Sequence, residues 1–343
     1  MNLECKNCGG KIHFEPSKKG NVCENCGSVF SVEYEFNFIK KPFESSESNL
    51  EQINLENNIE NFKCKLCGAS VLFNKNEVSS VCMYCGAQNM TPFRQNSLMK
   101  IDSVIPFSFN KAEALKRFKS SVGNRFFANK KIFRDVSKDD VKGAYINAFV
   151  FDLDTSITYR GVFSYTETRR DRDGNTRHVT RYRHVNGVYD NKFNNIMVEA
   201  NTNLTQPEIT QLMPFDYQKA VTFKQDFLNG YVLEYQEDMF KSCALTAEKI
   251  IKERVTRTLL NRYGCDRVVE LSIDVAYRDK KYNYCLLPVY FVDTIYKGNK
   301  YRALMNGQTG KVGKLPKDKL KMFLTISGIS AFILAIILAI IFM

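Results

Sequence analysis

The sequence lacks the common signatures of catalysis. Among its 343 residues there are three histidines, and neither H-E-x-x-H nor G-x-S-x-G occurs. The pattern G-x-x-x-x-G-K-[ST] is also missing, and the related run Gly307–Lys311 is too short and falls in an expected hairpin, which excludes a P-loop motor. No acid/base pair can be placed in a pocket from the sequence. We therefore expect that the protein is not an enzyme.

We also expect no secretory signal. The first residues, MNLECKNCGGKIHF, contain neither the basic nor the apolar region of a signal peptide. A cytosolic chain keeps its thiols reduced, so paired cysteines among the eleven present favour metal ligation over disulfides. Hydrophobic residues make up 44% of the chain, which is enough for a core and excludes wholesale disorder.

Eight of the cysteines form a tandem repeat. Each unit consists of Cys-x-x-Cys, fourteen residues and a second Cys-x-x-Cys, and the second unit begins 59 residues after the first. A glycine follows each pair, where the turn needs a positive φ. Four thiolates at this spacing predict a closed tetrahedral zinc site in a zinc ribbon, hence two Zn²⁺ per chain. The predicted ligands are Cys5, Cys8, Cys23 and Cys26 for the first ion and Cys64, Cys67, Cys82 and Cys85 for the second.

Two other cysteine chemistries fit the sequence less well than zinc. A thioredoxin-like redox pair would lie beside a βαβ pattern, which this sequence lacks. An iron–sulfur cluster also takes four thiolates, but the glycines and the two equal spacers suit zinc better. A site closed by four cysteines builds shape and leaves no position for catalysis. Near the ribbons, the alternation in 32–38 predicts a strand that completes the first one. The apolar run Val71-Leu72-Phe73 predicts an exposed edge for strand addition by a partner or for a small hydrophobic contact with it.

The C-terminal stretch Phe323–Met343 has no charged residue and is long enough to span a bilayer as a helix. Lysines precede it at positions 314, 317, 319 and 321, which favours the cytoplasmic side for the preceding chain. We therefore expect a single-pass protein of the cell membrane with a C-terminal anchor and the bulk of the chain in the cytoplasm.

The net positive charge of the chain lies outside the ribbons. Residues 1–103 contain 11 basic and 12 acidic side chains, whereas 104–343 contain 38 and 25. Within the basic part, 161–185 predicts a polar hairpin that turns at Asp173-Gly174 and carries six arginines. Its charges either protect a solvated sheet edge or bind anions, such as lipid headgroups or nucleic acid. The candidate anion-binding residues are Arg177, Arg181, Arg183, Lys317, Lys319 and Lys321.

The remaining patterns complete the domain plan. Asn110 and Glu113 predict a helix cap, the periodicity of 238–263 predicts a helix ended by Gly264, and 144–159 and 282–294 predict strands. The fold class is thus two tandem four-cysteine zinc ribbons, an α+β domain and one transmembrane helix. The expected bounds are 1–40 for ribbon 1, 41–61 for an acidic flexible linker, 62–95 for ribbon 2, 100–316 for the α+β domain and 323–343 for the tail anchor.

Several short runs give the chain a family resemblance. They are Ile105-Pro106-Phe107, Pro214-Phe215-Asp216-Tyr217, Leu287-Pro288-Val289-Tyr290 and, the most specific, Met305-Asn306-Gly307-Gln308-Thr309-Gly310-Lys311. With two ribbons and a terminal span, the chain resembles a bacterial family of membrane-anchored double zinc-ribbon proteins. Their ribbons look like those of general transcription factors, and some members carry primosomal or helicase-like labels. One departure is Ala148-Phe149, where the family tends to have Pro-Phe or Pro-Tyr.

The resemblance also implies partners. Members are often encoded beside band-7/flotillin-like (SPFH) proteins and phage-shock coat proteins, which implies an adaptor at the membrane. We therefore expect a tail-anchored adaptor whose ribbons recruit a protein partner of the SPFH type to the lipid bilayer. The alternative is a membrane-tethered nucleic-acid-binding protein. Ribbons that grip phosphates are basic, and the near-neutral charge of 1–103 disfavours that alternative.

Overall fold

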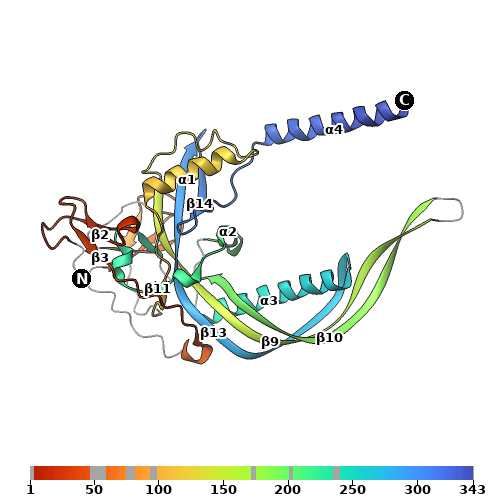
Figure 1. Ribbon diagram of the computed structural model, residues 1–343, viewed down its shortest axis with the longest axis horizontal. Coiled ribbons are helices and arrows are strands. Elements are labelled where there is room, and N and C mark those ends of the chain that lie inside the picture. Colours follow the sequence, from red (N-terminus) through yellow and green to blue (C-terminus); the bar gives the residue numbers. More distant parts are fainter. Residues whose placement is uncertain are drawn as a thin grey trace.

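A computed structural model of the protein is shown in Figure 1; it describes residues 4–46, 59–74, 82–92, 99–170, 175–200, 204–234 and 240–342. Two cysteine-rich β units come first, then a mixed α+β body and a long C-terminal helix, so the predicted order of parts is confirmed at this level. Most of the expected linker 41–61 and the expected turn at Asp173-Gly174 lie outside the described residues.

Three long strands organise the body. They are β9 (Val141–Arg170), β10 (Thr176–Glu199) and β13 (Arg267–Tyr296), with β9 antiparallel to a neighbour on each side. The sequence predicted strands over parts of β9 and β13, and both are far longer than expected. The extra length is polar because one face of the sheet is solvated there. The sequence pattern that indicates a strand is therefore lost, although the backbone hydrogen bonds between the strands continue.

Short strands extend this sheet at its base. On the β13 side lie β4 (Lys41–Pro42), β8 (Ser103–Val104), β11 (Val221–Thr222) and β14 (Asn299–Asn306), and on the β9 side lies β12 (Val232–Glu234). The strands of the second cysteine unit continue the sheet beyond β12.

The two faces of the sheet are covered differently. Odd-numbered side chains of β9, such as Phe149 and Phe163, pack with α1 (Lys111–Asn124) and α3 (Phe240–Tyr263) in the larger core. Even-numbered side chains at the start of β9, such as Ile146, pack with α2 (Gln206–Leu212) and the second cysteine unit. From Asp152 onward the even-numbered side chains are half-buried or exposed, except for the buried Ser164. Figure 1 shows α3 lying along the inner side of the curved sheet.

The helices follow the sequence signals. The side chain of Asn110 accepts a hydrogen bond from the Glu113 N–H at 3.1 Å and so caps α1 as predicted, while the Glu113 carboxylate contacts Arg117. Gly264 follows α3 with a φ of +61°, as predicted for a helix end. The buried side of α3 is built from Cys243, Ala247, Ile251, Val255 and Leu259.

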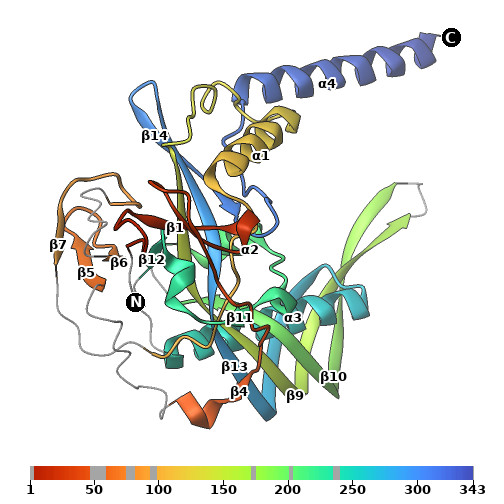
Figure 2. The ribbon, with the colours of Figure 1, turned by 60° about the vertical axis from the view of Figure 1, so that its left-hand side comes forward.

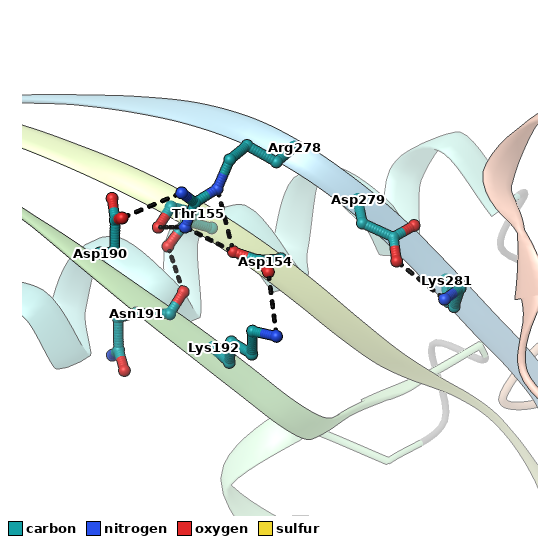
Figure 3. Close-up of polar contacts among 8 residues, drawn as sticks. All are labelled: Asp154, Thr155, Asp190, Asn191, Lys192, Arg278, Asp279 and Lys281. Carbon is teal, nitrogen blue, oxygen red and sulfur yellow. Dashed lines mark hydrogen bonds and ion pairs between the residues drawn. The ribbon is translucent and has the colours of Figure 1, made fainter.

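A charged cluster joins the three long strands at their bend. Arg278 of β13 lies 2.8 Å from a carboxylate oxygen of Asp154 on β9 and 2.9 Å from one of Asp190 on β10. Lys192 adds a second contact to Asp154 at 3.3 Å (Figure 3). Hydrogen bonds from Arg278 lower the pKa of Asp154. Register shifts in β13, between residues 277 and 279, and in β10 occur near this cluster, and such bulges bend a strand.

The C-terminal helix α4 (Lys319–Phe342) projects from the body. In Figures 1 and 2 it leaves on the same side as the far end of the β9–β10 hairpin, and that end reaches about as far outward as the helix does. The hairpin and α4 are therefore the two parts of the molecule that extend toward one side.

Candidate metal centres

The first cysteine unit surrounds a small sheet of β1 (Ile12–Glu15), β2 (Gly20–Cys23) and β3 (Val29–Ser31). Its four sulfur atoms lie within 4.8 Å of one another. Cys5 Sγ is 3.5 Å from Cys26 Sγ, and Cys8 Sγ is 3.5 Å from Cys23 Sγ. Cys5 and Cys23 are buried, whereas Cys8 and Cys26 are exposed. The structure thus brings the four predicted ligands together.

The second cysteine unit is built from β5 (Ile59–Cys64), β6 (Ser70–Asn74) and β7 (Met90–Pro92). Its sulfur atoms also lie within 4.8 Å of one another, with Cys64 Sγ 3.5 Å from Cys85 Sγ and Cys67 Sγ 3.7 Å from Cys82 Sγ. In the parts of the chain that the structure describes, these two quartets are the groups of His, Cys, Asp and Glu placed to hold a metal ion.

All four Cys-x-x-Cys turns share one hydrogen-bond pattern. In each, the N–H of the first cysteine donates to the carbonyl five residues later, as from Cys5 to Gly10 at 2.8 Å, and the glycine N–H donates back to the carbonyl of that cysteine. Each glycine has a positive φ, as predicted, because the chain turns back into the left-handed region there. The four glycines, with φ between +69° and +77°, are Gly9, Gly27, Gly68 and Gly86.

The donor set fits a tetrahedral metal ion. Four sulfurs at ~2.3 Å from a central ion lie ~3.8 Å apart, close to the separations of the facing pairs. Backbone N–H groups point at the sulfurs, as from Asn7 to Cys5 and from Tyr84 to Cys82, both at 3.4 Å, and such contacts favour thiolates. Hydrogen bonds from the side chain and backbone of Ser28 lower the pKa of Cys26 to about 6. Each quartet could therefore bind a metal ion, which would cross-link its turns.

The first unit docks on the body through side chains and a backbone hydrogen bond, without joining the main sheet. Phe14 contacts Phe227 edge-to-face at 5.3 Å between ring centroids, and its N–H donates to the Asn229 carbonyl at 2.9 Å. Asn21 donates from Nδ2 to Asp226 Oδ1 at 3.2 Å. This unit is thus fixed to the α+β body.

The predicted strand over 32–38 is wrong. Strand β3 ends at Ser31, and the following residues run onto the body, where Phe36 forms an isolated bridge with Val221. Tyr34 contacts Phe227 at 5.4 Å between ring centroids. The apolar alternation that predicted a ribbon strand reflects packing against the body.

The second unit joins the main sheet through its backbone. Strand β6 pairs with β12, with Leu72 opposite Leu233 and Val71 opposite Glu234, and Val71 is fully buried. The expectation that 71–73 offers an open edge to a partner is therefore wrong, because β12 occupies that edge. The body also holds the knuckle of this unit, since Arg302 donates to the Met83 carbonyl and Lys300 donates to the Cys85 carbonyl at 2.7 Å.

The predicted arginines lie on one face of the β9–β10 hairpin. Arg177, Arg181 and Arg183 alternate along β10 and stand opposite Arg169, Tyr165 and Phe163 of β9. The guanidinium of Arg183 lies 5.2 Å from the centre of the Tyr263 ring at the end of α3. Arg181 lies 3.5 Å from the Glu167 carboxylate, which also contacts Arg169 at 3.1 Å. Part of the charge on this face is thus already balanced.

The predicted lysines form a separate cluster at the start of α4. Lys317 and Lys319 are exposed, and the ammonium of Lys321 lies 3.8 Å from the centre of the Phe126 ring. The helix that follows is long and apolar enough to cross a membrane, and none of Lys319–Ile336 is buried. Length and composition make α4 a candidate span.

Residues 305–311, the most specific run of the family resemblance, hold the segment 212–216 through hydrogen bonds. The Asn306 amide donates to the carbonyls of Leu212 and Pro214 at 3.0 and 3.2 Å, and its oxygen accepts from the Gln308 N–H at 2.8 Å. Gln308 in turn accepts from the Asp216 N–H at 2.7 Å and donates to the Asp216 carbonyl at 3.0 Å. Sequence reasoning could not assign this role, because the partners lie some 92 positions away.

Comparison with known proteins supplies one distant relative. The chain is similar to the uncharacterized protein YdjG of Bacillus subtilis (strain 168), with 26% identity over 235 residues, which are 66% of this chain and 67% of YdjG. No family model matches the chain, and no solved structure matches it. The chain is therefore a distant homologue of YdjG that carries two four-cysteine clusters consistent with zinc ribbons.

Proposed function

We propose that the protein is a tail-anchored, zinc-stabilised adaptor that holds a protein partner at the cytoplasmic face of the membrane. Each cysteine quartet binds Zn²⁺, which builds shape and performs no chemistry, because four thiolates leave no open coordination position. The observation that carries the proposal is that both cysteine units and the start of α4 are fixed to one body. A partner held by the cysteine units is thereby held at a set position relative to the helix.

The partner surface is formed by the tips of the Cys-x-x-Cys turns. The tips at 6–7, 24–25 and 65–66 face solvent, whereas the fourth tip is held against the body with Met83 buried. Leu66, between Cys64 and Cys67, is 70% exposed. A large apolar side chain on a fixed turn, surrounded by polar neighbours, suits the centre of a small protein interface. Following the family resemblance, the proposed partner class is the SPFH type.

The test must spare the fold. Deleting 1–90 would remove β6 from the sheet together with its buried Val71 and would uncover the core side chains packed against it, so its loss of function would be ambiguous. We instead propose Leu66→Ser in the full chain, with Leu245→Ser as the matched control, since Leu245 is 61% exposed on α3. Membrane recruitment of a tagged SPFH protein should fall with Leu66→Ser and persist with Leu245→Ser. Equal recruitment by both variants would show that the turn tips do not form the partner surface.

The membrane part of the proposal rests on α4 and its lysines. A tagged full chain should stay in membranes after alkaline carbonate treatment, and protease added to spheroplasts should leave the cysteine units intact. Because the hairpin leaves the body on the same side as α4, an upright α4 would bring the polar hairpin end into hydrocarbon. We therefore expect α4 to open away from the sheet in a bilayer, so that the arginine face meets the anionic headgroups.

The arginine face also supports the second candidate, a membrane-tethered nucleic-acid-binding protein. Tyr165 of β9 stands opposite Arg181 on this face and is half-buried, which suits stacking of a base beside the arginines. The triple substitution of Arg177, Arg181 and Arg183 by Ser separates the two candidates. Loss of binding to acidic vesicles supports the lipid contact, whereas loss of a salt-sensitive binding to single-stranded DNA with unchanged vesicle binding supports the alternative.

A further inference from the structure

Two adjacent phenylalanines are exposed at the base of α4. Phe126 and Phe127 follow α1, and their side chains are 58% and 39% exposed. Their rings meet edge-to-face with 4.9 Å between the centroids. In both views the loop after α1 runs beside the start of α4 (Figures 1 and 2). An exposed aromatic pair at the base of α4 is a candidate interaction surface, and the start of α4 is its neighbour.

Backbone hydrogen bonds tie this loop to the beginning of the helix. Asp318 caps α4 by accepting the Lys321 N–H at 3.1 Å, and its own N–H donates to the Phe127 carbonyl at 2.8 Å. Asn129 donates its N–H to the Pro316 carbonyl, also at 2.8 Å. Phe127 therefore stays level with the first turn of α4, whatever angle the helix takes to the body.

The loop is also held firmly by the body. The guanidinium of Arg125 donates to the carbonyls of Val312 and Gly313, just upstream of α4. After the phenylalanines, Ile132 and Phe133 are buried in the main core. The aromatic pair thus stands on a fixed loop between two anchored ends.

The charge around the pair is mainly positive, with three carboxylates nearby: Glu113 pairs with Arg117, Asp135 pairs with Arg134, and Asp318 lies beside Phe127. Residues 114–134 contain seven basic side chains and no acidic one. The exposed ones are Lys116, Arg117, Lys119, Lys130, Lys131 and Arg134, and Lys321 of α4 lies over the Phe126 ring. Aromatic rings surrounded by lysine and arginine match the boundary between anionic headgroups and acyl chains, where rings lie in the interface and cations meet phosphates.

We propose that residues 125–131 form a second membrane contact, in which Phe126 and Phe127 insert into the headgroup boundary of the anionic leaflet beside α4. This inference rests on the proposed membrane span of α4. A helix alone leaves the body able to rotate about its axis and to lift from the surface. A second contact at the base of the helix limits both motions, and it sets the height of the body above the bilayer.

The chain contains no tryptophan, so Phe127→Trp introduces a single fluorescent reporter. The full chain is reconstituted in phosphatidylglycerol vesicles with and without brominated acyl chains, which quench tryptophan on contact. The matched control is Phe36→Trp, because Phe36 is 64% exposed and bridged to Val221 in β11, far from the start of α4 in both views. We expect about three-fold more quenching at position 127 than at position 36, with a blue-shifted emission.

Three outcomes are informative. Carbonate-resistant protein with equal quenching at positions 127 and 36 overturns the second contact and leaves the membrane anchor standing. Protein released by carbonate overturns the anchor, and the second contact with it. Phe126→Trp repeats the measurement if Phe127→Trp disturbs the loop. Adding Lys130→Glu and Lys131→Glu to Phe127→Trp should reduce quenching in phosphatidylglycerol, and unchanged quenching would overturn the role assigned to the basic residues.

Discussion

The two cysteine units have the same local chemistry and different attachments. Both have the same spacing, the same turn hydrogen bonds and nearly the same sulfur separations. The first forms its own three-stranded sheet and docks through side chains such as Phe14 and a single backbone hydrogen bond from Phe14, whereas the second lends β6 to the main sheet by pairing with β12. The first unit is therefore a separate small sheet attached to the body, and the second unit is part of the body's sheet.

This difference bears on what a metal ion bound in each unit would stabilise. A side-chain contact can be lost while the sheet beneath it stays intact. A strand that leaves a sheet exposes both its ladder and the apolar side chains that it covered, here those near Ile146. We therefore expect loss of the second metal to reach the body and loss of the first to remain local. Neither unit is isolated from the body.

The largest expected effect comes from removing a ligand in each unit. Metal binding contributes about 10–16 kcal/mol to the folding of small zinc domains, so each Cys→Ser variant should lose one of two zinc ions. Cys64→Ser should also speed amide exchange in β9 and lower the melting temperature of the body. Cys5→Ser should leave exchange in β9 near the wild-type rate. Metal analysis and hydrogen exchange measure both effects, and equal exchange in the two variants would contradict the comparison.

Truncating the two docking contacts gives the next effect. Phe14→Ala should cost about 3–5 kcal/mol, because a large buried ring leaves a cavity against Phe227. Val71→Ala should cost about 2 kcal/mol, because only two carbon atoms are removed. Denaturant unfolding measures both, with zinc content as the control that the clusters survive. A cost for Val71→Ala above that for Phe14→Ala would contradict the expected order.

A polar contact to the second unit should contribute less. Arg302 is bonded to both carboxylate oxygens of Asp293, at 2.7 and 2.9 Å, and donates to the Met83 carbonyl. We expect Arg302→Met to cost about 1–2 kcal/mol and to speed zinc release from the second unit to a chelator. Arg117→Met, which breaks an exposed pair with Glu113, is the control and should change neither quantity. Unchanged zinc release in Arg302→Met would show that this contact with the body does not support the Cys82–Cys85 turn.

The smallest expected effect lies outside both units, at Arg278. Its hydrogen bonds lower the pKa of Asp154 below the ordinary 3.8. A lowered carboxyl pKa stabilises the fold above the unfolded-state value, and this stabilisation is lost as the pH falls through the folded-state value. Arg278→Met should therefore lower the melting temperature slightly at pH 7 and not at all well below pH 4. A difference that persists in acid would mean that Arg278 acts through packing.

The parts of the site that the sequence predicted are short-range. A Cys-x-x-Cys turn ends in glycine because the turn itself needs a positive φ, so all eight ligands could be named from spacing alone. The cap at Asn110 and the helix end at Gly264 are local in the same sense. The apolar, uncharged tail predicted a long helix, and α4 is that helix.

The attachments of these parts were decided by tertiary structure. Asn306 contacts residues more than 90 positions away, and Val71 is covered by a strand some 160 positions later. The polar halves of β9 and β13 are strands because each supplies the other's hydrogen-bond partners, which no residue pattern in either one reveals. The sequence by itself determined which cysteines gather and which helix is apolar, since those depend on neighbours along the chain. Only the fold decided that the second ribbon is part of the sheet, because strand pairing depends on which backbone lies alongside in space.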